Sequence, residues 1–449
     1  MNPVQQLRMA AGARSPGLAR ARSAASADPA AAGAAEPQSG LSLLRSQGRV
    51  RGIVALLGPA FVASVAYIDP GNFATNFSAG ARFGYALAWV IVLANLMAML
   101  VQYLSAKTGV ATGRDLPELC REHLPRPVSV GLWLQAECVA MATDVAEFVG
   151  AAVGLNLLFH VPLLPAGLIT AVAAFGILAL EQRGYRRFEL AISGLLVIVL
   201  LGFAYDQVVV GANPRSIAAG LIPHFAGPGS QLLVVAIIGA TVMPHVVYLH
   251  SALTKSRVHC RDDDERRELL RFQRLDVLVA LGAAGLINLS MLFIAASVFS
   301  QGGAPHVESI QAAHAGIGQL VGGGAALAFA VALLASGLSS SSVGTYAGQV
   351  VMQGFIGRRI PLFVRRGITM LPALLVLGLG LPVTSSLVIS QVVLSFGIPF
   401  ALVPLVLLTR RADIMGALVN RRVTTAVAGG IAVVVTMLNG YLLYATLIG

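Results

Sequence analysis

The chain has 449 residues, of which 56% are hydrophobic and only 11% are charged, and its mean hydropathy is +0.79. This composition excludes an ordinary soluble protein and is typical of one that crosses a membrane many times. The net charge is +11, but 29 of the 31 lysines and arginines lie in the N-terminal stretch or in alternate loops, on one predicted side of the membrane. The charge therefore orients the protein by the positive-inside rule and does not indicate a nucleic-acid partner.

The N-terminal stretch, residues 1–50, differs from the rest of the chain. It is rich in Ala, Ser, Arg and Pro and has no hydrophobic period, so we predict a disordered cytoplasmic tail. Its Arg- and Ser-rich start also resembles an organellar transit peptide, but Asp28, Glu36 and the prolines argue against that alternative.

Residues 51–449 are predicted to form an all-α polytopic membrane domain. Eleven apolar segments are long enough to span a bilayer, with approximate limits 53–79, 85–109, 129–158, 162–181, 188–210, 231–254, 275–300, 316–343, 361–381, 385–409 and 423–447. With eleven segments, the basic residues fall in the N-terminal stretch and in every second loop. The positive-inside rule then places the N-terminus in the cytoplasm and the C-terminus outside. The lipid bilayer is the expected partner, its anionic lipids included, and no obligate protein partner is evident.

Several classes of activity lack support in the sequence. Neither lysine, Lys107 or Lys255, follows a glycine, so no Walker A loop is encoded and an ion gradient is the expected energy source. The three cysteines are too far apart for a disulfide framework or a Cys-x-x-Cys site. No catalytic dyad or cofactor motif is present, so we expect no enzyme and no cofactor.

Two apolar segments are interrupted by a proline next to a candidate metal ligand. The first contains Asp69-Pro70-Gly71-Asn72, and the second contains Met243-Pro244-His245. Proline removes a backbone donor, so each segment is predicted to unwind and to free carbonyl groups near the bilayer midplane. Matching interruptions in two halves of a chain are typical of the substrate site of a transporter.

The residues at these interruptions suggest a cation. Asp69 is a carboxylate within a membrane segment, where it acts as a metal ligand, a proton acceptor or both; the alternative is a buried carboxylate that caps a helix. Asn72 is close enough in sequence to offer a second oxygen to the same ion. Met243 is a packing residue or a soft thioether ligand, and as a ligand it favours manganese, iron and cobalt over magnesium and calcium.

The third segment carries three acids, Glu137, Asp144 and Glu147, on one helix face. They form a proton route, or they pair with arginines and hold the bundle together. Arg365 and Arg366 are candidate partners, or ordinary charges at the cytoplasmic end of segment nine. His245 either moves protons or is a neutral hydrogen-bonding residue.

These motifs resemble the Nramp family of divalent metal transporters, and in particular its bacterial manganese transporters. The resemblance covers roughly residues 50–449. It rests on the two interrupted segments, on Ala142-Thr143-Asp144-Val145-Ala146-Glu147 in the third segment and on Gln391-Val392-Val393-Leu394-Ser395-Phe396 in the tenth. One departure is Val246, where many members have Asn.

The resemblance implies a LeuT-like fold, with residues 53–210 and 231–409 as inverted five-helix repeats and residues 423–447 as an eleventh helix. It also implies which residues hold the metal: Asp69, Asn72, Met243, the carbonyls of Ala66 and Ala240, and in an occluded state Gln391. The residues that the resemblance implies for the proton path are Asp144, Glu147, His245, Arg365 and Arg366, and the pattern of acids within membrane segments adds Asp69 and Glu137.

The sequence thus predicts a proton-coupled importer of divalent metals in the bacterial plasma membrane. Mn²⁺ is the first expected substrate and Fe²⁺ the second, with Cd²⁺ and Co²⁺ also accepted. The rival hypotheses are a sodium-coupled amino-acid carrier of the same fold, an ion channel and a membrane enzyme. Asp69 would repel the carboxylate of an amino acid, and a channel does not need paired broken helices.

Overall fold

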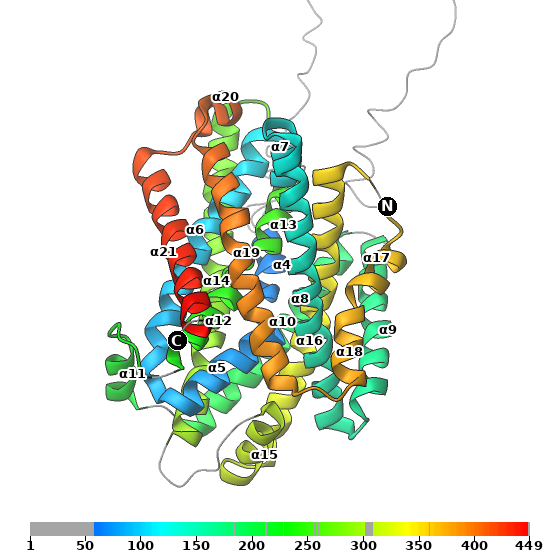
Figure 1. Cartoon of the computed structure of the whole chain (residues 1–449), viewed down its shortest axis with the longest axis vertical. Helices are drawn as coiled ribbons and strands as arrows, with labels where there is room; N and C mark the ends of the chain where they lie inside the picture. Colours follow the sequence, from blue (N-terminus) through cyan, green and yellow to red (C-terminus); the bar gives the residue numbers. More distant parts are fainter. Residues whose placement is uncertain are drawn as a thin grey trace, which may run out of the picture.

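The chain folds into a bundle of α-helices in the computed structural model, and the residues that the structure describes contain no β-strand (Figure 1). These residues are 58–182, 185–211, 213–227, 229–255, 257–258, 260–300, 309–358 and 360–447. The predicted tail, residues 1–50, lies outside them. Within the described residues, eight helical segments are long and apolar enough to cross a membrane, which confirms the prediction of an all-α membrane protein.

The helices follow one another along the chain with short connections. The first half contains α4 (Pro59–Ala66), α5 (Pro70–Phe83), η1 (Gly84–Leu87), α6 (Ala88–Thr112), α7 (Leu116–His123), α8 (Arg126–Phe159), α9 (Leu163–Gln182), α10 (Tyr185–Val210) and α11 (Pro214–Gly220). The second half contains α12 (Ser230–Thr241), α13 (Pro244–Lys255), α14 (Asp263–Phe299), α15 (Ile310–Leu320), α16 (Gly323–Ile356), α17 (Leu362–Thr369), α18 (Leu371–Gly378), α19 (Val383–Thr409), α20 (Ala412–Met415), η2 (Gly416–Leu418) and α21 (Arg422–Leu447).

Both predicted interruptions are present, and proline chemistry explains where they fall. Pro70 begins α5 and Pro244 begins α13. In a continuous helix their N–H groups would donate to the carbonyls four residues earlier, those of Ala66 and Ala240, but proline has no N–H. Each proline therefore removes the helical partner of one particular carbonyl, and the chain turns out of the helix between the two halves.

Helix α14 begins well before the predicted apolar segment 275–300. Asp262 caps its N-terminus and accepts hydrogen bonds from the backbone N–H groups of Asp264 at 3.0 Å and Glu265 at 2.8 Å. Capped in this way, the hydrophilic residues that follow are helical, although hydropathy alone predicts a loop there.

Segments eight and nine also differ from their predicted limits. Gly322, with φ of +130°, separates α15 from α16, so the long helix at predicted segment eight runs from Gly323 to Ile356 and not over 316–343. The predicted segment 361–381 is two short helices, α17 and α18. Pro372 lies in the first turn of α18 and cannot donate to the carbonyl of Ile368, which ends the preceding helix.

The broken helices lie in the interior of the bundle (Figure 1). Helix α12 packs against α5 and α19, and α8 packs closely against α16. Glycines permit the second contact: a Cβ on Gly154 would lie 2.7 Å from Leu334 N, and one on Gly337 would lie 2.8 Å from Ala151 N. Close backbone approach through small residues is typical of membrane helices.

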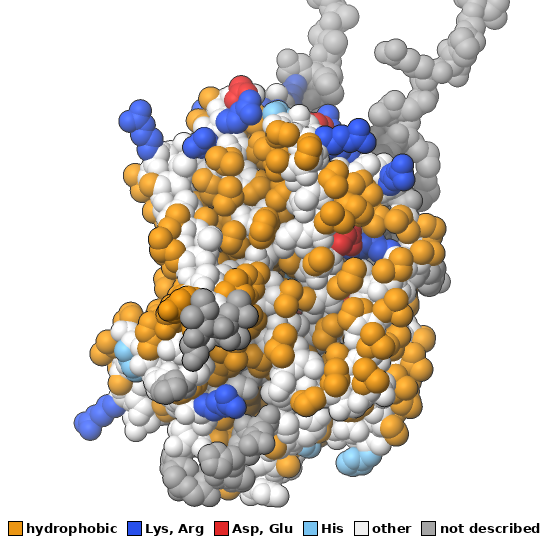
Figure 2. Space-filling view, viewed as in Figure 1, with side chains coloured by type: hydrophobic (Ala, Val, Ile, Leu, Met, Phe, Trp, Pro, Cys, Tyr) orange, Lys and Arg blue, Asp and Glu red, His pale blue; other side chains and the backbone are white. Residues whose placement is uncertain are grey.

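The two ends of the bundle differ in charge. Lysine and arginine side chains gather at the end that carries α7 and α20, whereas hydrophobic side chains cover the middle of the visible face (Figures 1 and 2). We call this end the basic end. Helices α11 and α15 lie at the opposite end (Figure 1).

The first residues of α4 are fixed to other helices by hydrogen bonds. The Asp276 carboxylate on α14 accepts hydrogen bonds from Gly58 N at 3.2 Å and from Ala60 N at 2.9 Å. Beside them, Arg257 forms an ion pair with Glu189 at 3.2 Å, close enough that a Cβ on Gly58 would overlap the Glu189 carboxylate. The half-helix that ends at Ala66 is therefore held at its start by hydrogen bonds to α14 and packs there against Glu189 of α10.

Candidate metal centre

Asp69 and Asn72 form the first part of the candidate site. Asp69 precedes α5 in an extended conformation, and its Oδ1 accepts hydrogen bonds from Asn72 N at 2.9 Å and from Asn72 Nδ2 at 2.8 Å. Both residues are fully buried. The carboxylate thus caps the helix, as one prediction allows, and its charge also lies in the interior of a membrane protein.

Asn72 connects the two broken helices. Its Nδ2 donates to the carbonyl of Ala240 at 2.9 Å, although 168 residues separate the two positions. This is the carbonyl that Pro244 leaves without a helical donor. The two interruptions, predicted separately from the sequence, therefore meet at one point in the structure.

Several buried acceptors at this point lack a donor. In the part of the chain that the structure describes, no hydrogen bond reaches Asn72 Oδ1, Gln391 Oε1 or the carbonyl of Ala66. The next two carbonyls, of Tyr67 and Ile68, accept hydrogen bonds from Asn288 Nδ2 and from Ser336 Oγ. Buried acceptors normally have partners. An excess of unpartnered oxygens beside a carboxylate is the arrangement that a cation would complete.

Gln391, on α19, contacts the first interruption directly. Its Nε2 donates to Asp69 Oδ2 at 3.3 Å. The side chain lies over Gly71, where an added Cβ would be only 1.7 Å from Gln391 Nε2. Because glycine has no side chain, position 71 provides the space that the Gln391 side chain occupies.

Met243 lies between α12 and α13 and is fully buried. It precedes Pro244, in the non-helical step that also exposes the Ala240 carbonyl. Among the described residues, no three His, Cys, Asp or Glu side chains come together to hold a metal. A metal at this point would instead be held by one carboxylate, amide and backbone oxygens and a thioether, a mixed set that suits a borderline divalent ion.

The acids of α8 have different environments. Glu137 forms an ion pair with Arg365 at 3.1 Å and accepts a hydrogen bond from Trp133 Nε1 at 3.2 Å. Arg366 donates to the backbone oxygen of Ser341 at 3.0 Å and to its hydroxyl, and its guanidinium lies 5.3 Å from the centre of the Phe148 ring and 5.0 Å from that of Phe175. It also interacts electrostatically with Asp144 and Glu147.

Asp144 and Glu147 have no ion pair with any described residue. Both oxygens of Glu147 are buried without a hydrogen bond among the described residues. One turn further along α8, a Cβ on Gly150 would lie 1.9 Å from Pro70 Cβ, which places this face of α8 against the start of α5. Among the described residues Glu147 therefore has no ion pair, and it interacts electrostatically with Asp144, Asp69 and Arg366.

His245 connects α13 to α8. Its Nδ1 lies 3.3 Å from Thr143 Oγ1, and its Nε2 has no hydrogen-bond partner among the described residues. Of the residues predicted for the proton path, Glu147 on α8 interacts electrostatically with Asp69 at the start of α5, and His245 at the start of α13 approaches α8 at Thr143. Arg365 and Glu137 form a separate ion pair on α17 and α8.

Sequence reasoning missed a second polar chain beside the site. Gln102 Nε2 donates to the Tyr67 hydroxyl at 2.5 Å, and Gln102 Oε1 lies 2.8 Å from His250 Nδ1. Gln102 and Asn288 lie within apolar helices, where a polar amide needs a partner. A polar amide in an otherwise apolar segment was therefore the feature of the sequence that could have predicted these hydrogen bonds.

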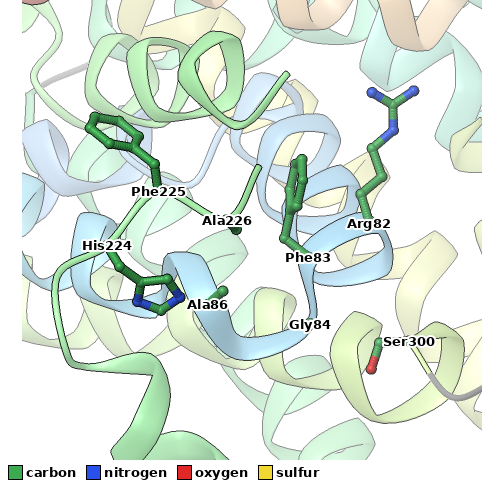
Figure 3. A pocket seen from close by; sticks show the side chains of 8 residues that line it. All are labelled: Arg82, Phe83, Gly84, Ala86, His224, Phe225, Ala226 and Ser300. Atoms are coloured by element: carbon green, nitrogen blue, oxygen red, sulfur yellow. The ribbon is translucent and has the colours of Figure 1, made fainter. Parts of the chain in front are cut away.

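A cavity of about 600 Å³ lies elsewhere, at the end opposite the basic end. Its lining residues come from the end of α5, η1, the segment before α12 and Ser300 (Figure 3). Arg82 and His224 belong to it, but none of the candidate site residues does. The candidate metal centre is instead a closed contact between buried polar atoms.

The chain is similar to known transporters over most of its length. A family model described as natural resistance-associated macrophage protein-like (Nramp) matches residues 60–445. The divalent metal cation transporter MntH of Deinococcus radiodurans is 54% identical over 402 residues, which cover 89% of this chain and 92% of that protein. The protein of the same name from Bacillus subtilis is 52% identical over 397 residues, covering 88% and 93%.

Solved structures agree with this similarity. A mutant of the Eremococcus coleocola manganese transporter is 32% identical, with a TM-score of 0.78 over 87% of this chain and 86% of that one. The nucleobase-cation-symport-1 transporter MHP1 is 13% identical, with a TM-score of 0.56 over 79% of this chain and 78% of that one. MhsT is 16% identical, with a TM-score of 0.55 over 85% of this chain and 98% of that one. These two likenesses concern the fold alone, which is the predicted LeuT-like one.

Proposed function

The chain belongs to the Nramp family, and from this premise we propose that it imports divalent transition metals together with protons. It is a transporter and not an enzyme, as the names of its curated relatives indicate. Mn²⁺ is the first substrate and Fe²⁺ the second, and Cd²⁺ and Co²⁺ are also accepted. The protein lies in the bacterial plasma membrane with its basic end toward the cytoplasm, its N-terminus inside and its C-terminus outside.

The proposal depends chiefly on the unpartnered oxygens around Asp69. Asn72 Oδ1, Gln391 Oε1 and the Ala66 carbonyl are buried acceptors near one carboxylate, and the Ala240 carbonyl joins them once Asn72 turns toward a metal. A dehydrated divalent cation needs several such oxygens and a negative charge to offset the loss of its water. The Met243 sulfur adds a soft ligand, which favours Mn²⁺ and Fe²⁺ over Mg²⁺ and Ca²⁺.

Glu147 supports the proton part of the proposal. Its carboxylate is buried and has no ion pair or hydrogen bond among the described residues, while Asp69 and Arg366 both interact with it electrostatically, so a proton at Glu147 would respond to a charge that enters at Asp69. Metal entry at Asp69 adds positive charge nearby, which favours loss of a proton from Asp69 or Glu147. We assign Asp144 and His245 to the same route, with Glu137, Arg365 and Arg366 further along α8 and α17.

The same geometry disfavours a carrier of amino acids. The start of α5 is the positive end of a helix dipole and would otherwise suit a substrate carboxylate. Here Asp69 already occupies that position and accepts the Asn72 N–H. The negative charge of Asp69 would repel an anionic substrate, whereas it would attract a cation.

Uptake by the purified protein in liposomes would test the proposal. Vesicles with a neutral interior are diluted into buffer at acidic or neutral pH, and uptake of Mn²⁺, Fe²⁺, Cd²⁺, Mg²⁺ and Ca²⁺ is compared. We expect saturable Mn²⁺ and Fe²⁺ uptake that the acidic exterior accelerates, with little Mg²⁺ or Ca²⁺ uptake. Uptake that is indifferent to the proton gradient would contradict proton coupling, and uptake that does not saturate would indicate a channel.

A further inference from the structure

Three basic side chains converge at the basic end, outside the metal site. Lys107 lies near the end of α6, Arg274 in the first half of α14, and Arg421 just before α21. The Arg274 guanidinium lies 5.8 Å from the centre of the Tyr103 ring, and Arg421 interacts electrostatically with both Tyr103 and Lys107. We call Lys107, Arg274 and Arg421 the basic cluster.

In the part of the chain that the structure describes, no side chain supplies an anion to this cluster. Lys107 is only 6% exposed, and its Nζ donates to a neutral group, Asn420 Oδ1, at 2.8 Å. Within the described residues none of the three members forms an ion pair, although exposed arginines of the same end do so: Arg266 with Asp263 and Arg267 with Asp264, each at 2.9 Å. Like charges that are close together destabilise one another unless an anion lies between them, and the buried charge of Lys107 is the least screened by water.

The surroundings of the cluster indicate where the anion comes from. Helices α6 and α14 run antiparallel here, with Gly282 facing Met99 and Gly285 facing Asn95 further into the bundle. From Arg274 the exposed face of α14 continues with apolar residues at helical spacing, Leu275, Leu278 and Val279, each about half exposed. The basic cluster therefore lies next to an exposed apolar stripe on α14, an arrangement that suits a molecule with a charged head and an apolar tail.

We propose that the basic cluster binds the phosphate of an anionic phospholipid in the cytoplasmic leaflet, with an acyl chain along α14. A phosphodiester accepts hydrogen bonds from two arginines and a lysine at once, and basic pockets between membrane helices at the cytoplasmic side suit such headgroups. Tyr103 occupies the interfacial level that is typical of aromatic residues. The bound lipid connects α6, α14 and the segment between η2 and α21.

The test counts bound lipid and requires no transport, so its outcome is independent of the proposed function. The full chain in zwitterionic phosphatidylcholine nanodiscs is titrated with phosphatidylglycerol, and the lipid that stays bound on release is quantified by native mass spectrometry. Inorganic phosphate is titrated in a parallel series. The variants are Arg274→Ala/Arg421→Ala, whose side chains are exposed, and the charge-matched control Arg266→Ala/Arg267→Ala, which removes two arginines from ion pairs on the same end.

We expect the wild type and the control to retain phosphatidylglycerol equally and the cluster variant to bind it about tenfold more weakly or worse. Lys107→Gln, which preserves a donor to Asn420, should weaken binding in the same direction. Equal retention by all variants would overturn the proposal, as would an equal loss in the control, since bulk charge would then explain it. Displacement of the lipid by inorganic phosphate would show that the cluster takes the free anion instead.

Discussion

Gly71→Ala isolates the contribution of Gln391 to the metal centre. Position 71 is helical, so alanine fits the backbone without strain and favours the helix slightly. The new Cβ would lie 1.7 Å from Gln391 Nε2, 2.3 Å from its Cδ and 2.8 Å from its Cγ. These atoms belong to a flexible side chain, so the glutamine moves away while the fold persists.

The displaced side chain loses its hydrogen bond to Asp69 Oδ2, a contact of 3.3 Å. Because this hydrogen bond forms without a metal, its loss does not itself weaken metal binding; the change weakens binding because it removes Gln391 Oε1 as a ligand. A polar contact to a charged group contributes about 1.5–3 kcal/mol, and we take the lower value for one ligand among several. We therefore expect the KM for Mn²⁺ uptake to rise about tenfold, because about 1.4 kcal/mol corresponds to a factor of ten.

Initial rates of Mn²⁺ uptake in liposomes measure this effect. Gly194→Ala is the matched control, because a Cβ at this exposed position on α10 would have no atom within 4 Å. Gln391→Ala should raise KM similarly, and the double variant should be no worse than Gln391→Ala alone, since both changes remove one contact. A wild-type KM for Gly71→Ala, or additive effects in the double variant, would refute the assignment of Gln391 to the site.

Three further predictions concern other parts of the transport cycle. Met243→Ala should reduce Cd²⁺ and Mn²⁺ uptake and relax the rejection of Ca²⁺; an unchanged Ca²⁺-to-Mn²⁺ preference in competition assays would make Met243 a packing residue. Asp144→Asn and Glu147→Gln should still bind Mn²⁺ but lose metal-stimulated proton entry, as measured with a pH dye inside liposomes; a wild-type ratio of proton to metal flux in both would place the proton path elsewhere. Asp276→Ala should free the start of α4, so that a cysteine introduced at buried Val62 in a cysteine-free background is alkylated faster; an unchanged rate would show that α4 is held by other contacts.

The interruptions of the membrane helices could be predicted from the sequence because their cause is local. Pro70 and Pro244 lack an N–H wherever the chain places them, so Ala66 and Ala240 lose their helical donors in any fold. The same argument applies to Pro372, which separates α17 from α18. The prediction of one continuous segment nine used mean hydropathy, which does not detect a single proline.

The partners of the polar side chains could not be predicted in this way, because they depend on helix packing between distant parts of the chain. Asn72 reaches Ala240 across 168 residues, and Arg365 reaches Glu137 across 228. The sequence places Glu137 and Glu147 on one helix face, yet only the structure shows that the first forms an ion pair and that the second has none among the described residues.

The central claim is that Asp69 provides the charge with which a divalent metal is carried, and Asp69→Asn tests it most directly. Asparagine keeps the shape and can still cap α5, so the variant should insert and fold normally. Mn²⁺ uptake by equal amounts of wild-type and variant protein in liposomes, with an acidic exterior, is the deciding measurement. We expect near-complete loss of uptake in the variant; Mn²⁺ transport at a rate comparable to that of the wild type would contradict the claim.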